Sequence, residues 1–403
     1  MSILNFKDIK LVISRALSPE TEILKYRFKP FTKSKTGCFG THSSLEVITQ
    51  QEANKKKYVV SQSFFVKTFP ESFLIREELM DEDMFTEEVH FYDEVQPLMM
   101  NKLKLQRWSP KCYLAREHTL VFEDLRAQDF NVIASNEFDL LHLRAALSAL
   151  SRFHASTILT EKRLGITMKQ AYPNAFNEKL FACHKKFARG IPVGFDAIAY
   201  MAKKFGLNSS IVPKIYNLVF GLVKMQGNGC NVICHGDLWK NNILFDKTVP
   251  HPNCVMVDYQ FLRYASPNTD VAMLIYLHTN PEFRQKHELD MFNHYYSSLN
   301  GMLSRNKCAL EEFSYDVMLK DYHKHKIVGM ALGCLYLPGV FLKPELLQKI
   351  MNEPETMNAW FLGNRKKIIQ QNMDDHPDYE QNLKDRIVEL IQEAEKVILS
   401  GYN

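Results

Sequence analysis

The chain has 403 residues, a formal net charge of +4, and a composition that is 46% hydrophobic and 24% charged. This length allows a large buried core and predicts two lobes. No dense stripe of lysine and arginine with interleaved aromatic residues occurs, so we expect no binding to nucleic acid.

The first residues predict an amphipathic helix, because apolar side chains recur at helical spacing at Leu4, Ile9, Val12, Ile13 and Leu17. No basic region followed by an unbroken apolar core occurs there, so we expect no secretion signal. The eight cysteines form no C-x-x-C pair, which favours free thiols in a reducing compartment. We therefore expect a cytoplasmic, monomeric protein.

Two glycines, Gly37 and Gly40, precede a β-prone run from Leu45 to Thr49. Glycines in such a turn let backbone amides approach a phosphate, and their position in the chain suits a nucleotide-binding loop. The full G-x-G-x-x-G pattern is absent, so an ordinary turn is the alternative. The segment Asn54–Lys57 then predicts a charged hairpin turn.

The next strand-like run, Ser63 to Pro70, carries Lys67. An apolar helical face follows near Glu88 and consists of Met84, Phe85, Val89, Phe91 and Tyr92. In kinases, an ion pair between a strand lysine and a helix glutamate holds the ammonium against the inner phosphates of the nucleotide. Lys67 and Glu88 fit this pair, with three neighbouring glutamates as alternatives: Glu77, Glu78 and Glu87.

Two more strands are predicted from Lys111 to Glu117 and from His118 to Leu125. The second would join the lobes, and its exposed backbone would pair with an adenine edge through the carbonyl of Glu123 and the amide of Leu125. An ordinary surface strand end is the alternative. We predict a nucleotide-binding N-lobe over residues 1–125 and, over residues 126–403, a C-lobe that carries the catalytic loop, metal site and acceptor pocket.

Helices are expected after this point. Leu140–Ile158 predicts a buried helix on which His154 is a core histidine rather than a ligand, and residues 383–398 predict a final amphipathic helix. The apolar stretch Ile327–Leu342 contains Pro338 and is shorter than the roughly 20 residues that a membrane span needs. It would form either one wall of an acceptor pocket or part of the core.

The segment Asn231–Gln260 places two carboxylates and an amide at the ends of apolar runs. Asp237 follows the first run, Asn242 lies five positions later, and Asp258 closes the second run. Phosphoryl transfer needs a carboxylate that orients the attacking hydroxyl, together with oxygen ligands for a divalent metal. Asp237 fits the base and the other two fit the metal ligands, whereas a lone H-x-D triplet would indicate only a strand-end turn.

Together these residues resemble the insect ecdysteroid kinase-like family, also described as the choline-kinase-like (CHK) group of the protein-kinase-like superfamily. The matching segments, in chain order, are FFVKTFP, MFTEEVHFYDEVQP, PKCYLARE, LVFEDL, HGDLWKNNILF and VDYQFLRYASPNTD. The most specific part is HGDLW followed by NILF, with DYQ where protein kinases have DFG. The resemblance runs from Gly37 into the C-terminal third, although GCFGTH matches the family's glycine loop only loosely.

The resemblance implies an α+β, two-lobed protein-kinase-like fold, with a small antiparallel-sheet N-lobe that has one long helix and a larger, mainly helical C-lobe. It implies ATP-dependent phosphorylation of a hydroxyl on a small lipophilic molecule, an ecdysteroid or a related steroid or xenobiotic, with Mg²⁺ as the second cofactor. The residues carry over as Asp237 for the base, Asn242 and Asp258 for the metal, and Lys67 with Glu88 for the phosphates. His235 and Asp270 would support the catalytic loop.

Other functions stay open at this level. A choline or ethanolamine kinase would need an anionic or aromatic cage for its cationic substrate. A pseudokinase or a lipophile carrier would keep the fold and lose the metal chemistry. Lys240 would either contact the transferred phosphate or be a solvated lysine.

Overall fold

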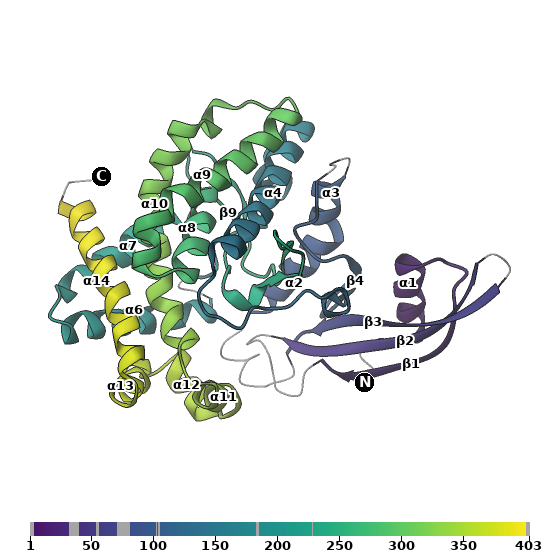
Figure 1. Ribbon diagram of the computed structural model, residues 1–403, viewed down its shortest axis with the longest axis horizontal. Helices are drawn as coiled ribbons and strands as arrows, with labels where there is room; N and C mark the ends of the chain where they lie inside the picture. The colour runs from purple at the N-terminus through teal and green to yellow at the C-terminus, as the bar shows by residue number, and fades with distance from the viewer. Residues whose placement is uncertain are drawn as a thin grey trace.

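The structure, a computed structural model, describes residues 4–31, 40–53, 56–70, 81–101, 103, 105–182, 185–227 and 229–399. A small part built on a sheet and a larger helical part lie side by side (Figure 1). The predicted α+β architecture is confirmed. The predicted boundary between residues 125 and 126 stays a prediction.

The small part contains a five-stranded sheet in which every neighbouring pair is antiparallel. Its order is β1-β2-β3-β5-β4, so β1 and β4 form the edges. The strands are β1 Glu22–Pro30, β2 Thr41–Ala53, β3 Lys56–Thr68, β4 Cys112–Arg116 and β5 Thr119–Glu123. Ala53 pairs with Lys56, so β2 and β3 form a hairpin as predicted; its tip, residues 54–55, lies outside the described residues.

Side-chain alternation along β3 gives the sheet two different faces. Phe64 and Val66 pack in one cluster with the apolar side of helix α1 (Phe6–Ala16), which is the helix predicted at the N-terminus. Phe65 and Lys67 point to the opposite face, towards the helical part. The strand period therefore places Lys67 on the face that looks into the cleft between the two parts.

The predicted long helix of the small part is present and contains a π-helical turn. The continuous run consists of α2 (Glu82–His90), the π-helical turn η2 (Phe91–Val95) and α3 (Gln96–Met100). The π turn places Phe91 against Tyr259, with ring centroids 4.7 Å apart and nearly parallel planes. A π turn inside an α-helix is common close to functional sites.

The strand β5 ends at Glu123, two residues earlier than predicted, and Leu125 begins the short 3₁₀ helix η3 (Leu125–Gln128). Two small two-stranded sheets follow in the helical part. Strand β6 (Val232–Cys234) pairs with β9 (Arg263–Ala265), and β7 (Ile243–Phe245) pairs with β8 (Cys254–Met256).

The helical part packs long helices around a common core (Figure 1). The predicted helix at Leu140 is confirmed and extends to Leu164, and the predicted final helix is also present. The helices are α4 Leu140–Leu164, α5 Met168–Ala171, α6 Gly190–Lys204, α7 Val212–Leu222, α8 Pro267–His278, α9 Pro281–Arg305, α10 Tyr315–Val340, α11 Pro344–Asn352, α12 Pro354–Phe361, α13 Arg365–Asp375 and α14 Pro377–Leu399. Short 3₁₀ turns are η4 Phe187–Arg189, η5 Ser209–Ile211, η6 Lys240–Asn242 and η7 Glu311–Phe313.

Helix α10 crosses α8 at very short range. A Cβ added to Gly329 would lie 2.5 Å from the carbonyl oxygen of Ala272, so only glycine allows this approach. Within the described residues, no helix is by itself long and apolar enough to cross a membrane, whereas α10 and α11, bent by 93° relative to each other, meet that criterion as a pair. The first half of the stretch Ile327–Leu342 is buried core.

Candidate active site

The loop after β6 is held by a single carboxylate from α8. Asp270 accepts hydrogen bonds from the backbone N–H groups of His235 (2.5 Å) and Gly236 (3.0 Å), which is the bracing role that the resemblance implied. Gly236 has a φ of +80°, and a Cβ there would lie 2.2 Å from the carbonyl oxygen of Phe261. Glycine is therefore required at the centre of HGD, and the loop has one fixed shape.

The Asp237 carboxylate is buried and held from two sides. One oxygen accepts from Asn242 Nδ2 at 2.9 Å, and the other accepts from the hydroxyl of Tyr336 on α10 at 3.0 Å. Burial, and secondly the nearby carboxylate of Asp258, raise the pKa of Asp237 to about 7. A carboxylate with this pKa matches the requirement for a general base at neutral pH.

Asn242 and Asp258 have the oxygen donors that a hard divalent cation prefers. Both hydrogen bonds of the Asn242 side chain go to acceptors, the carbonyl and the carboxylate of Asp237, so its amide nitrogen must face them. The amide oxygen is thereby left for another partner. Asp258 has a φ of +69°, a left-handed conformation that aspartate tolerates better than most residues, and its side chain is 28% exposed. The pair fits a Mg²⁺ ion.

Lys67 and Glu88 form the ion pair that the sequence predicts, with 2.6 Å between Nζ and Oε2. Lys67 also lies 2.6 Å from Asp258. Burial alone would lower the pKa of Lys67, but these two carboxylates raise it above the usual value, so the lysine stays charged. Their role in nucleotide binding stays a prediction.

The alternative partners of Lys67 have other positions. Glu87 faces away from it and accepts from Lys179 Nζ and, at 2.5 Å, from the backbone N–H of Phe176. Glu77 and Glu78 lie outside the described residues. Among the described glutamates, Glu88 is therefore the one that pairs with Lys67.

The structure describes three of the four other residues predicted to bind the nucleotide. Gly37 lies outside the described residues. Gly40 is buried, and a Cβ there would lie 3.4 Å from Cε of Lys67, so it borders the lysine. Glu123 and Leu125 both line the cavity. The Glu123 carboxylate is engaged elsewhere, because it accepts from Arg107, from the Lys111 amide and from Gln128.

One cavity of about 1260 Å³ is lined by Lys67, Glu88, Glu123, Leu125, Asp237, Asn242, Asp258 and Tyr336. Its first half carries the polar members of this set, together with apolar side chains of the small part such as Phe31, Phe65 and Phe122. Its second half is mainly apolar and is formed by η4, the start of α6, the last turns of α10, and α11 to α13. Residues of this apolar half include Phe187, Ile191, Leu335, Val340, Leu342, Ile350, Trp360 and Phe361. The later half of Ile327–Leu342 thus contributes a cavity wall, and the earlier half contributes core.

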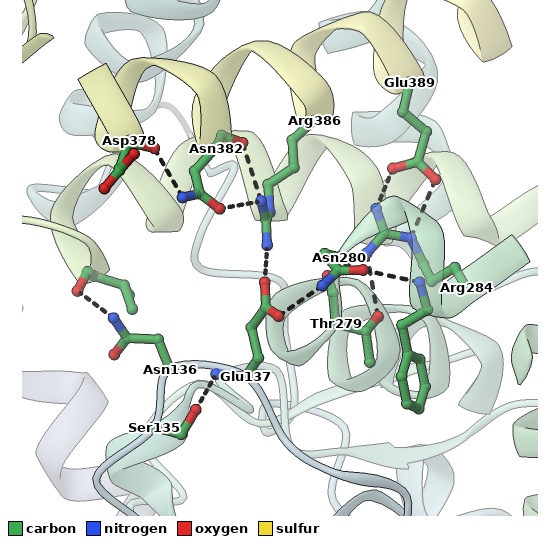
Figure 2. A network of polar contacts seen from close by, with 12 residues as sticks. Ser135, Asn136, Glu137, Thr279, Asn280, Arg284, Asp378, Asn382, Arg386 and Glu389 are labelled. Carbon is green, nitrogen blue, oxygen red and sulfur yellow. Dashed lines mark hydrogen bonds and ion pairs between the residues drawn. The ribbon is translucent and has the colours of Figure 1, made fainter. Parts of the chain in front are cut away.

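Behind the loop, a polar network connects distant helices (Figure 2). Glu137 accepts from Arg386 of α14 and from Asn280, each at 2.8 Å. The preceding residue, Asn136, donates to the carbonyl of Val340 at 3.4 Å and accepts from Lys240 at 2.5 Å. Lys240 is thus partly buried, lines the cavity and bonds to Asn136, and the segment before α4 ties the catalytic loop to α10 and α14.

Sequence reasoning missed Tyr336 as a partner of Asp237. It lies 99 positions further along the chain, so no local motif could connect the two. The one available signal was a phenol inside an otherwise apolar stretch, since a buried tyrosine hydroxyl usually finds a polar partner. His154, predicted to be a core histidine, is fully buried and bonds to Tyr295 (2.7 Å) and Asp270 (3.3 Å).

The family model described as "Ecdysteroid kinase-like family" matches residues 43–308, more than half of the chain. The chain belongs to the ecdysteroid kinase-like family. This is a family of kinase-like small-molecule phosphotransferases, so the predicted family is confirmed. No curated protein sequence matches the chain.

Several solved structures are similar to this ecdysteroid kinase-like chain. An ethanolamine kinase of Plasmodium vivax is 11% identical, with 83% of each chain covered and a TM-score of 0.37. The gentamicin–APH(2″)-IIa complex is 11% identical, covering 92% of this chain and 97% of that one, with a TM-score of 0.42. A microcompartment-associated aminopropanol kinase is 10% identical, covering 95% and 100%, with a TM-score of 0.41. At this level of similarity, their substrates do not identify an acceptor for this chain.

Proposed function

We propose that the protein is an ATP- and Mg²⁺-dependent kinase that phosphorylates a hydroxyl of a neutral, bulky lipophile, with an ecdysteroid or a related hydroxylated steroid or xenobiotic as the leading candidate. The observation that carries this proposal is the single cavity, in which a polar half with the kinase residues opens into an apolar half. The family membership supports the same reaction class.

In the polar half, Lys67 would hold the inner phosphates, with Glu88 fixing its position. A magnesium ion on Asn242 and Asp258 would neutralise the charge on the phosphates. Asp237 would align the acceptor hydroxyl and take its proton as the new oxygen–phosphorus bond forms, while the bond from the terminal phosphorus to its bridging oxygen breaks and ADP leaves. Tyr336 and Asn242 keep the Asp237 carboxylate in one orientation for this step.

The lining of the apolar half disfavours a cationic acceptor. Among the described lining residues, the acids are Glu88, Glu123, Asp237 and Asp258, and all four belong to the polar half. One aromatic ring of the apolar half, that of Trp360, has the Arg365 guanidinium 4.9 Å from its centroid. A cationic group that reached this ring would meet a fixed positive charge there.

A side-by-side assay tests this proposal. Purified protein is incubated with ATP, Mg²⁺ and one acceptor at a time: a hydroxylated steroid, a plant phenolic, choline or ethanolamine. We expect ADP release that depends on the acceptor, with the highest kcat/KM for the steroid. The Asp237→Asn variant serves as the matched blank for contaminating kinases.

Two results would contradict the proposal. A higher kcat/KM for choline or ethanolamine would make the protein a kinase of that type. Tight nucleotide or steroid binding without any acceptor-dependent ADP release would indicate a ligand-binding pseudokinase or a carrier.

A further inference from the structure

Arg365 is a buried cation on the wall of the apolar half of the cavity. It is the first residue of α13, lines the cavity, and is only 8% exposed. Its Nε donates to the carbonyl of Trp360 at 2.9 Å, and its Nη1 lies 3.5 Å from the carbonyl of Leu335. These two contacts fix the plane of the guanidinium.

The charge of Arg365 is not compensated by an acid. Four arginines are buried among the described residues, and three of them pair with a carboxylate: Arg263 with Glu178, Arg284 with Glu389, and Arg386 with Glu137. No carboxylate of the described part of the chain pairs with Arg365. Burial lowers its pKa to about 10, which leaves it charged at neutral pH.

A guanidinium has five N–H donors, and the two contacts above use two of them. The other three have no hydrogen-bond partner among the described residues. Buried donors, and buried charges above all, are normally satisfied, because leaving them unpaired costs free energy. A side chain of this kind on a cavity wall indicates a ligand group that accepts hydrogen bonds.

We propose that Arg365 is a specificity-determining residue, which binds a carbonyl or carboxylate oxygen of the acceptor while another part of that molecule presents its hydroxyl to Asp237. This inference rests on the proposed function and adds the chemistry of the acceptor's second polar group. The same guanidinium rejects acceptors that carry a positive charge at this position.

One helix, α10, contacts both residues that would bind the two ends of such an acceptor. Leu335 and Tyr336 are neighbours on α10; the carbonyl of Leu335 contacts Arg365, and the hydroxyl of Tyr336 donates to Asp237. The same turn of α10 therefore contacts both the Arg365 guanidinium and the Asp237 carboxylate. Apolar pockets that hold a ligand by a few polar groups commonly achieve specificity in this way.

The test uses three acceptors with one hydroxylated polycyclic skeleton that carries a ketone, a carboxylate or a plain methylene at the far end. We expect wild-type kcat/KM, and equilibrium affinity, to be about 10- to 100-fold lower for the methylene compound, the range expected for one hydrogen bond to a charged donor. Arg365→Met should remove this preference by weakening only the oxygenated compounds. The ranking of ketone against carboxylate tells whether the natural acceptor is neutral or anionic there.

Arg386→Met is the matched control, because Arg386 is equally buried but does not line the cavity. It should leave the preference intact, and neither variant should change the KM for ATP. An unchanged preference in Arg365→Met, or equal wild-type affinity for the ketone and methylene compounds, overturns the inference; the second criterion holds even if Arg365→Met does not fold. If the wild type binds these compounds without phosphorylating any, the proposed function fails, and the binding data still decide the role of Arg365.

Discussion

At the scale of single residues, the hydrogen bonds within the site determine which side-chain atoms remain for binding a ligand. The side-chain nitrogen of Asn242 donates to Asp237, which leaves the amide oxygen of Asn242 for a metal. Asn242 and Tyr336 both donate to the Asp237 carboxylate and fix its orientation. Lys67 contacts an acid from each part of the molecule, Glu88 and Asp258. Different substitutions should therefore impair separate steps.

Asp237→Asn should lower kcat by about 10²–10⁴-fold, because the amide keeps the size of the side chain but cannot accept the hydroxyl proton. The affinity for Mg²⁺·ATP should change little, since the phosphate and metal contacts are made by other residues. Steady-state kinetics together with equilibrium nucleotide binding would measure both quantities. Turnover near the wild-type level would remove Asp237 from the mechanism.

Asp258→Ala should abolish nucleotide binding that depends on magnesium, because the site then retains only a neutral amide oxygen. Excess magnesium should partly rescue Asn242→Ala but not Asp258→Ala. Titrating nucleotide affinity against magnesium in both variants tests the assignment. Small and equal effects in the two variants would count against these residues as metal ligands.

At the scale of elements, two adjacent acids of α2 bond this helix to two other segments. Glu88 pairs with Lys67 of β3, while Glu87 pairs with Lys179, whose side chain is 5% exposed. Lys179 belongs to the segment that leads to Leu180 and Phe187 on the cavity wall. A second, more exposed ion pair joins Asp83 to Lys185 of the same segment at 2.5 Å.

Lys179→Met should destabilise the protein by about 3 kcal/mol, because it leaves the largely buried Glu87 carboxylate without a cation and with the backbone N–H of Phe176 as a partner. It should also weaken nucleotide binding, since Glu88 is the next residue on the same helix. Lys185→Met is the control and should cost about 0.5 kcal/mol, as exposed ion pairs do. Urea unfolding with and without nucleotide provides the measurement, and equal losses in the two variants would contradict a special role for Lys179.

At the scale of the whole molecule, the cavity unites residues from both parts of the chain. The polar network of Figure 2 joins the segment before α4 to Asn280, at the start of α9, and to α14. His278 ends α8 near this network, fully buried and stacked on Phe138 with ring centroids 4.0 Å apart. Its Nδ1 bonds to the carbonyl of Leu274, while its Nε2 has no partner among the described residues. Burial, with a smaller contribution from the positive charge of Lys240, lowers the pKa of His278 to about 4.

This lowered pKa predicts a loss of stability in acid. Between about pH 6.5 and pH 4, the unfolded chain binds a proton at His278 that the folded protein does not, so stability is full above this window and falls within it, by up to about 3 kcal/mol. His278→Asn, which keeps a donor for the carbonyl of Leu274, should reduce the slope of unfolding free energy against pH. His251→Asn, which replaces an exposed histidine, should leave this slope unchanged. Equal slopes in wild type and His278→Asn would contradict this role.

The sequence predicted those features whose cause is local. Asp237, Asn242 and Asp258 lie within 22 residues of one another along the chain, and strand alternation was sufficient to orient Lys67. Tyr336 could not be predicted, because its role depends on how α10 packs against a loop 99 positions earlier in the chain. Arg365 could not be predicted, because its place on the cavity wall depends on contacts with α12 and α10. The π turn at Phe91–Val95 likewise follows from packing against Tyr259 rather than from a sequence pattern.

The paired acids of α2 have a thermodynamic consequence. An acceptor that fills the apolar half touches the segment carrying Leu180 and Phe187, and that segment is bonded through Lys179 to the helix that presents Glu88 to Lys67. If a ligand in one half of the cavity stabilises α2, the ligand that binds afterwards in the other half meets a helix that is already ordered. Linkage is reciprocal, so the factor by which the acceptor tightens nucleotide binding must equal the factor by which the nucleotide tightens acceptor binding. The two dissociation constants of this enzyme are therefore properties of the pair of ligands, and each must be measured at a stated concentration of the other.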